Sequence, residues 1–227
     1  ESERELATIE AVGIVLDPLA LATGRIAVSR LDVDGAMFNA ALLPKSKPLD
    51  LAALRISDVP DYLETTFERL DGIHRLIDAN GMQTVRIADL GATFQGPGGK
   101  PVTLAIDSLQ FTRDGDSTMS IDGHFSMDGA EGEIDLTASG AQDVVQTLDG
   151  SIRNVALGKF LLGNDVNGNV HAGVDTTADI SVNAVRETTG TKPVLGLDIS
   201  LAAGTVYGDG IPAELRPSTL KAVYNFD

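Results

Sequence analysis

Alternation of apolar and polar residues runs through most of this chain and constrains its fold more than any other feature. In residues 195–203 every second residue is apolar, and mostly small or polar residues stand between them. Residues 119–127 and 134–138 repeat the pattern. A period of two predicts strands with one apolar and one polar face. Between residues 104 and 111 the phase slips by one residue, which predicts a β-bulge.

Turn sequences between the alternating segments indicate how the strands pair. Asp114-Gly115-Asp116 and Asp128-Gly129-Ala130-Glu131-Gly132 each separate two such segments by a length typical of hairpins. Consecutive hairpins predict antiparallel pairing, because parallel neighbours need long crossover connections. A short helical turn is predicted near residues 157–162.

Residues 61–79 break the pattern and have the spacing of an amphipathic helix. Asp58 is the expected N-cap, and Asn80-Gly81 is the expected end. We expect the apolar stripe to pack on the apolar face of the sheet; it comprises Leu63, Phe67, Leu70 and Ile77. The solvated face is predicted to comprise Glu64, Glu68, Arg69, Asp71, Arg75 and Asp78.

A single helix cannot cover the apolar faces of roughly ten strands, so the sheet must fold on itself or bind something apolar. The predicted fold is mainly β: a strongly curved antiparallel sheet, forming a groove or a partly closed barrel or sandwich, with one amphipathic helix at about 61–79. The alternation continues throughout, so residues 1–227 are expected to form a single β-rich segment.

Composition excludes several classes of partner and chemistry. Lys and Arg total 17 against 33 Asp and Glu, a formal net charge of -16, which argues against binding nucleic acid or an anionic membrane surface. The absence of Cys removes disulfides, thiol catalysis and Cys-based zinc sites. The opening residues, Glu1-Ser2-Glu3-Arg4-Glu5, resemble the middle of a longer sequence, and we expect the chain to be a segment of one.

No motif for catalysis or metal binding emerges. His74, His124 and His171 lie far apart and form no metal-binding pattern, so a structural role is expected. The sequences at 32–35 and 164–169 faintly resemble calcium loops, but the first lacks a third ligand and a terminal Glu, and the second lacks the repeat of calcium-binding β-rolls. Both are interpreted as turns. Gly96–Lys100 is followed by Pro101 and a strand, whereas a phosphate-binding loop opens a helix. We expect no enzymatic activity, no metal and no cofactor.

Several segments follow one another in a distinctive order: residues 9–17, 23–36, the helix ending near Ile77, 85–90, 121–126, 148–155 and 219–227. Their order resembles that of AsmA-like envelope proteins, in particular the YhdP branch. The likeness rests on the rhythm of the strands and covers nearly the whole chain.

The resemblance implies a periplasmic segment of a protein that an anchor outside this chain holds in the bacterial inner membrane. It also implies phospholipid transport between the inner and outer membranes, and outer-membrane homeostasis, through a curled β-sheet with an apolar interior and no catalytic residues. The implied partners are phospholipid acyl chains, neighbouring segments of the same polypeptide and the inner membrane. Nucleic acid is not an expected partner.

The inward strand faces are predicted to line a groove for acyl chains. The candidate residues are Leu104, Ile106, Phe125, Met127, Ile134, Leu136, Leu195, Leu197, Ile199 and Leu201. A dry, closed core built from the same residues is the structural alternative. The functional alternative is a cell-surface or secreted β-sandwich module that binds polysaccharide or protein; the absence of Trp and the presence of only 3 Tyr weaken the polysaccharide version.

Overall fold

The computed structural model describes residues 7–35, 37–39, 59–79, 81–95, 101–115, 117–141, 144–164, 169–187 and 193–224. Its helices are α1 (Pro18–Ala22), α2 (Val59–Ala79) and α3 (Gly158–Leu161). Its strands are β1 (Ala7–Thr8), β2 (Ala11–Leu16), β3 (Val28–Asp34), β4 (Met37–Asn39), β5 (Thr84–Gln95), β6 (Pro101–Arg113), β7 (Thr118–Met127), β8 (Ala130–Ala141), β9 (Val144–Ala156), β10 (Gly163–Asn164), β11 (Val170–Asp175), β12 (Thr177–Val185), β13 (Val194–Leu201), β14 (Gly204–Gly208), β15 (Ile211–Leu215) and β16 (Ser218–Tyr224).

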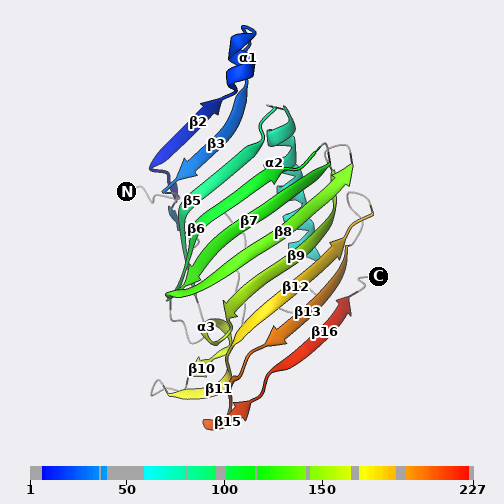
Figure 1. Cartoon of the computed structure of the whole chain (residues 1–227). Helices are drawn as coiled ribbons and strands as arrows, with labels where there is room; N and C mark the ends of the chain where they lie inside the picture. Colours follow the sequence, from blue (N-terminus) through cyan, green and yellow to red (C-terminus); the bar gives the residue numbers. More distant parts are fainter. Residues whose placement is uncertain are drawn as a thin grey trace.

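Twelve of the described strands form one curved sheet (Figure 1). The main order is β1-β4-β5-β6-β7-β8-β9-β12-β13-β16, and β2 and β3 extend the edge beside β5. No described strand pair joins β1 or β2 to β16, so this sheet stays open. The prediction of a mainly β fold with a strongly curved sheet and one long helix is confirmed.

The sheet is mixed, whereas the sequence predicted antiparallel pairing throughout. β3 and β4 both run parallel to β5. The chain between β4 and β5 includes α2, and so long a connection lets it return in the same direction. The hairpins predicted between β6 and β7 and between β7 and β8 are present and antiparallel.

The predicted β-bulge lies in β6. Ile106 pairs with Phe125 and Ser108 pairs with His124, which leaves Asp107 as the extra residue. The bulge keeps Ile106 and Leu109 on the same face, although residues three positions apart lie on opposite faces of a regular strand.

Two short helices accompany α2. α3 falls within the predicted helical turn at 157–162. α1 is not among the predicted elements, although Asp17-Pro18 is a typical helix start. The Asp17 carboxylate accepts hydrogen bonds from the amides of Leu19 and Ala20.

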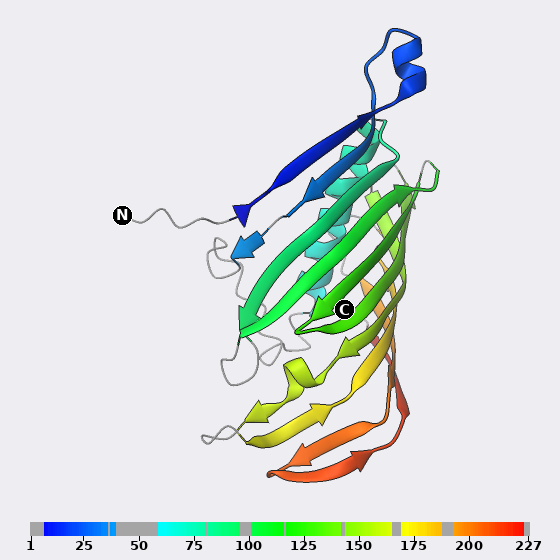
Figure 2. The same cartoon turned by 60° about the vertical axis from the view of Figure 1, so that its left-hand side comes forward.

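The β12–β13 hairpin continues beyond the large sheet into a smaller one of order β10-β11-β14-β15 (Figure 2). The ribbon changes sheet at Thr176, a buried residue between β11 and β12. Its hydroxyl donates a hydrogen bond to the Ala202 carbonyl at 2.9 Å, which ties the two strands together at that point.

α2 packs on one face of the large sheet, which we call the inner face. The helix begins two residues before the predicted start, while Asp58 and Asn80 lie outside the described residues. Phe67, Leu70 and Ile77 are buried and Leu63 is partly buried, as predicted. They pack with sheet residues in what we call the α2 cluster, whose buried sheet members are Val85, Phe111, Met119, Ile121, Ala138, Val145, Leu148, Ala184 and Leu195.

Candidate functional site

The inner face is apolar from one edge of the large sheet to the other. A row of directly paired residues crosses ten strands: Val12, Val33, Ile87, Leu109, Gly123, Ile134, Ile152, Ile180, Ile199 and Leu220. The adjacent row comprises Ile14, Leu31, Val85, Phe111, Ile121, Leu136, Gly150, Val182, Leu197 and Ala222. Because directly opposed residues share a face, these rows form a continuous apolar surface that contains no polar side chain.

The outer face is polar over the same strands. The row between the two apolar rows comprises Gly13, Asp32, Arg86, Gln110, Asp122, Asp135, Ser151, Ser181, Asp198 and Lys221. At its β16 end, Lys221 Nζ lies 2.7 Å from Asp198 Oδ2. The hydrogen bond to Asp198, together with its negative charge, raises the pKa of Lys221. The sheet therefore has one polar face and one apolar face along its whole width.

All ten residues predicted to line a groove lie on the inner face. Ile134, Leu136, Leu197 and Ile199 belong to the two apolar rows. Four others lie an even number of positions from a row residue of the same strand, which puts them on the same face: Phe125 and Met127 in β7, and Leu195 and Leu201 in β13. The last two lie in β6, where Leu104 pairs with Met127 and Ile106 pairs with Phe125. The alternation within each strand thus predicts the face of these side chains without reference to the pairing of the strands.

The ten residues differ in how much protein covers them. Phe125, Met127 and Leu195 are each 5% exposed, and the other seven are half-buried. Leu195 lies in the α2 cluster, and Leu136 and Leu197 pack against it. Three of the candidates therefore lie in dry, packed positions, as the closed-core alternative predicts, and the half-buried ones keep surface that a ligand can contact.

A second apolar cluster lies outside the reach of α2 on the same face. Val102, Phe125 and Met127 form its buried part, and Leu104, Ile106 and Ile134 pack against them. Gly132 lies directly opposite Phe125 in the neighbouring strand, and a Cβ at position 132 would collide with the Phe125 ring. A glycine is needed there because the aromatic ring lies over the backbone of β8.

A buried ion pair fastens α2 to the sheet. The Arg186 Nη2 atom lies 2.9 Å from both carboxylate oxygens of Asp71. The Arg186 side chain is fully buried, that of Asp71 is 10% exposed, and the guanidinium carbon lies 4.8 Å from the centroid of the Phe67 ring. Arg186 Nη1 is buried and has no hydrogen-bond partner among the described residues.

The same two side chains satisfy the backbone of β9. Asp71 Oδ1 accepts a hydrogen bond from the Val145 amide at 2.7 Å, and Arg186 Nη2 donates to the Val145 carbonyl at 2.7 Å. β12 ends at Val185, opposite Thr147, and does not reach Val145. The side chains of the ion pair therefore provide hydrogen bonds to the Val145 N–H and C=O beyond the point where β12 stops pairing with β9.

The prediction that Asp71 lies on the solvated face of the helix is wrong. Asp71 follows Phe67 by four residues and precedes His74 by three, so helical geometry places it beside the buried stripe. That spacing indicates a buried position for Asp71, but the charge of the side chain favoured a prediction on the solvated face. Arg186 offered no local signal, because it follows a strand and lies 115 residues from Asp71.

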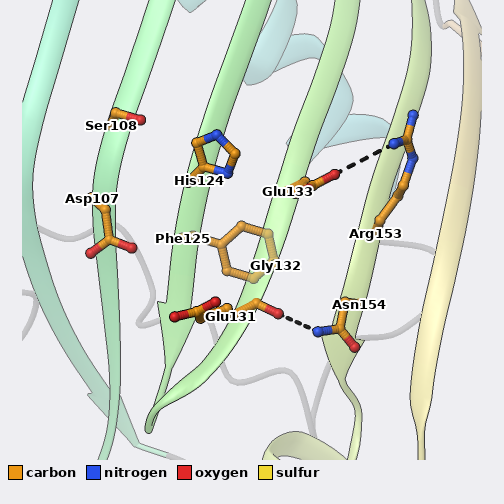
Figure 3. A pocket seen from close by; sticks show the side chains of 9 residues that line it. All are labelled: Asp107, Ser108, His124, Phe125, Glu131, Gly132, Glu133, Arg153 and Asn154. Atoms are coloured by element: carbon orange, nitrogen blue, oxygen red, sulfur yellow. Dashed lines mark hydrogen bonds and ion pairs between the residues drawn. The ribbon is translucent and has the colours of Figure 1, made fainter.

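The outer face carries a polar hollow of about 580 Å³ (Figure 3). Its lining residues are Asp107, Ser108, His124, Phe125, Glu131, Gly132, Glu133, Arg153 and Asn154. Glu133 Oε2 lies 3.4 Å from Arg153 Nη1, and the Asn154 side-chain Nδ2 donates a hydrogen bond to the Glu131 carbonyl. These charged side chains are exposed on the polar side of the sheet and turn away from the apolar surface.

The described residues contain no metal-binding arrangement. No group of three or more His, Asp or Glu side chains among them is placed to hold an ion. His74 is buried on α2, His124 lines the outer hollow, and His171 pairs with Asp209 at 3.6 Å. Asp32 and Asp34 lie in β3 instead of a turn, while 165–168 and 96–100 lie outside the described residues.

Comparison with known proteins adds no relative. No protein-family model, no curated protein and no solved structure matches this chain. None of the described helices is long and apolar enough to cross a membrane.

Proposed function

We propose that this chain is a segment of a periplasmic protein, anchored in the inner membrane, that moves phospholipids between the inner and outer membranes. Its inner face holds the acyl chains, and its polar outer face is in contact with water. The observation that carries the proposal is the apolar surface that crosses the open sheet from β2 to β16. The resemblance to AsmA-like proteins supports the same assignment.

The half-buried part of this surface suits a flexible chain. Ile134, Ile152, Ile180 and Ile199 lie opposite one another on four neighbouring strands and are all half-buried. Strands are about 4.8 Å apart, so these four residues span roughly 14 Å. Each methylene buried there contributes about 0.8 kcal/mol, and ten of them contribute roughly 8 kcal/mol before the entropic cost of binding.

The arrangement requires no charged recognition site for the head group. The exterior is acidic, and the formal net charge of -16 disfavours anionic head groups near the protein. Head groups would stay at the open rim of the sheet in water, while the acyl chains lie against the inner face. The protein would then distinguish lipids mainly by their acyl chains.

The test is photo-crosslinking in living cells with the full-length protein. A photoreactive amino acid replaces Ile134 or Ile199, and matched controls carry it at Asp135 or Asp198, one residue along the same strand on the outer face. We expect phospholipid adducts, identified by mass spectrometry, at the two inner positions only.

Two results would count against lipid transport. Absence of lipid adducts at both inner positions would leave the closed-core alternative, and equal labelling on both faces would indicate nonspecific contact with membrane. Adducts with a polysaccharide or a protein would favour the binding-module alternative instead.

A further inference from the structure

α2 lies across the inner face of the large sheet (Figure 2) and carries apolar side chains on a second side besides its buried stripe. Tyr62 is 38% exposed, Leu76 is 43% exposed, and Ile73 is half-buried. Their spacing puts the three within about 60° of one another around a helix with 3.6 residues per turn. We call Tyr62, Ile73 and Leu76 the α2 flank.

Two ion pairs fix the direction in which the α2 flank points. Asp71 binds Arg186, which follows the last residue of β12. Asp78 Oδ1 lies 2.8 Å from Nη2 of Arg113, the last residue of β6. Both arginines lie at the end of the sheet where β6 connects to β7 and β12 to β13. Each helical residue is turned about 100° from the one before it, so the α2 flank lies roughly 140–180° around the helix from Asp71. The flank therefore points away from this end, over the middle of the inner face.

The sheet beside the α2 flank keeps part of its apolar surface uncovered. Leu136, Val182 and Leu197 are each half-buried, and they pack against the α2 cluster as Ile73 does. They lie in one row, because Gly150 pairs with both Leu136 and Val182, and Val182 pairs with Leu197. Gly150 carries no side chain, so the row is lined by large side chains only on β8, β12 and β13. The α2 flank and this row are two apolar surfaces on adjacent elements.

The other side of α2 is charged. Glu64, Glu68 and Arg75 lie within about 40° of one another around the helix and roughly 110–150° from the middle of the α2 flank. Arg69 is the one charged residue of α2 on the side of the flank. Its aliphatic stem can lie along the flank while the guanidinium group stays in water. The distribution of charge on α2 thus favours hydrocarbon on the flank and water on the opposite side.

We propose that α2 forms a second wall of the acyl-chain site, so that acyl chains contact the α2 flank while they lie on the row of Leu136, Val182 and Leu197. This inference rests on the proposed function. A chain lying on the sheet alone buries one side of each methylene, and contact with the helix buries a second side. Because apolar burial is favourable in proportion to the area removed from water, the second wall strengthens binding. Asp71 and Arg186 are then positioning residues, which hold this wall beside the sheet.

Photo-crosslinking in living cells with the full-length protein tests the second wall. A photoreactive amino acid replaces Tyr62 or Leu76, and the matched control carries it at Glu68, which is exposed on the charged side of the same helix. Ile199 is the reference position on the sheet. We expect phospholipid adducts at both flank positions and at Ile199, and none at Glu68.

The outcomes separate this inference from the proposed function. Adducts at Ile199 without adducts at either flank position would refute the second wall and leave lipid transport standing. Absence of adducts at Ile199 and at both flank positions would count against both. Labelling of Glu68 as strong as that of the flank would show nonspecific contact around the whole helix, and would also refute the second wall.

A charge on the α2 flank tests the same contact by a second measurement. Leu76→Glu places a carboxylate where we expect the acyl chain, and Glu68→Gln is the control on the charged side of the helix. We expect Leu76→Glu to lower the yield of lipid adducts at Ile199 roughly tenfold, because the favourable burial of a leucine is lost and a charge has to leave water. Glu68→Gln should leave this yield unchanged, and both variants should keep the circular dichroism spectrum of the unaltered protein. An unchanged yield in Leu76→Glu would overturn the proposal.

Discussion

Replacing Arg186 by Met tests whether the buried ion pair holds α2 on the sheet. The substitution leaves the Asp71 carboxylate, 10% exposed, with the Val145 N–H as its remaining hydrogen-bond partner among the described residues. It also removes both guanidinium hydrogen bonds to the Val145 carbonyl. Removing one partner of a buried ion pair costs about 3–5 kcal/mol, because the other charge stays buried without compensation.

Urea unfolding followed by circular dichroism measures this loss. With an m value of about 2–3 kcal/mol/M, a loss near 4 kcal/mol lowers the midpoint by roughly 1.3–2 M. Arg153→Met is the matched control, since Arg153 is 51% exposed and pairs with Glu133 in solvent. It should change the stability by less than about 1 kcal/mol.

The double variant Asp71→Leu/Arg186→Met separates charge from packing. It removes both charges and leaves the Val145 N–H and C=O without side-chain partners, at about 1–3 kcal/mol each. The expected loss of about 2–6 kcal/mol is centred about 4 kcal/mol below the roughly 6–10 kcal/mol sum of the two single losses. An unchanged midpoint for Arg186→Met, or strict additivity in the double variant, would refute the buried ion pair as the anchor of α2.

Two further predictions concern packing on the inner face. Phe67→Ala should lower the free energy of unfolding by about 3–5 kcal/mol because Phe67 is 1% exposed; Tyr62→Ala, on the same helix but 38% exposed, should have a much smaller effect on the denaturation midpoint. Gly132→Ala should destabilise by about 1–3 kcal/mol, since its Cβ would meet the Phe125 ring. Gly208→Ala, where a Cβ meets nothing within 4 Å, is the control in the same thermal-melt assay and should melt like the unaltered chain.

The sequence predicted the two faces of the sheet correctly because that information is local. Alternation in β7 or β13 follows from the backbone geometry of a strand, whichever strand lies beside it. The same reasoning located α2 to within two residues of its start and the bulge in β6. It also placed all ten groove candidates on one face, although it did not distinguish packed Phe125 from half-buried Ile199.

In the candidate site, the sequence did not predict which inner side chains α2 covers or which polar residues hold α2 on the sheet. How much of each inner side chain is covered depends on where α2 lies, and the helix sequence specifies only which of its own faces is apolar. The sequence predicts Asp71 on the solvated face of the helix, because a carboxylate is rarely buried without a partner. Its partner, Arg186, lies 115 residues away in the sequence and comes close to Asp71 only because β12 pairs with β9.

The amphipathic strands, the hairpins and the amphipathic helix could be predicted from the sequence, since each depends on residues close together in the chain. The parallel pairing of β3 and β4 with β5, the open sheet, and the apolar rows that continue from Val12 to Leu220 became visible in the folded chain. Packing and backbone hydrogen bonds between distant segments set the register of the strands and the position of a helix on a sheet, and the pattern within one segment does not specify them.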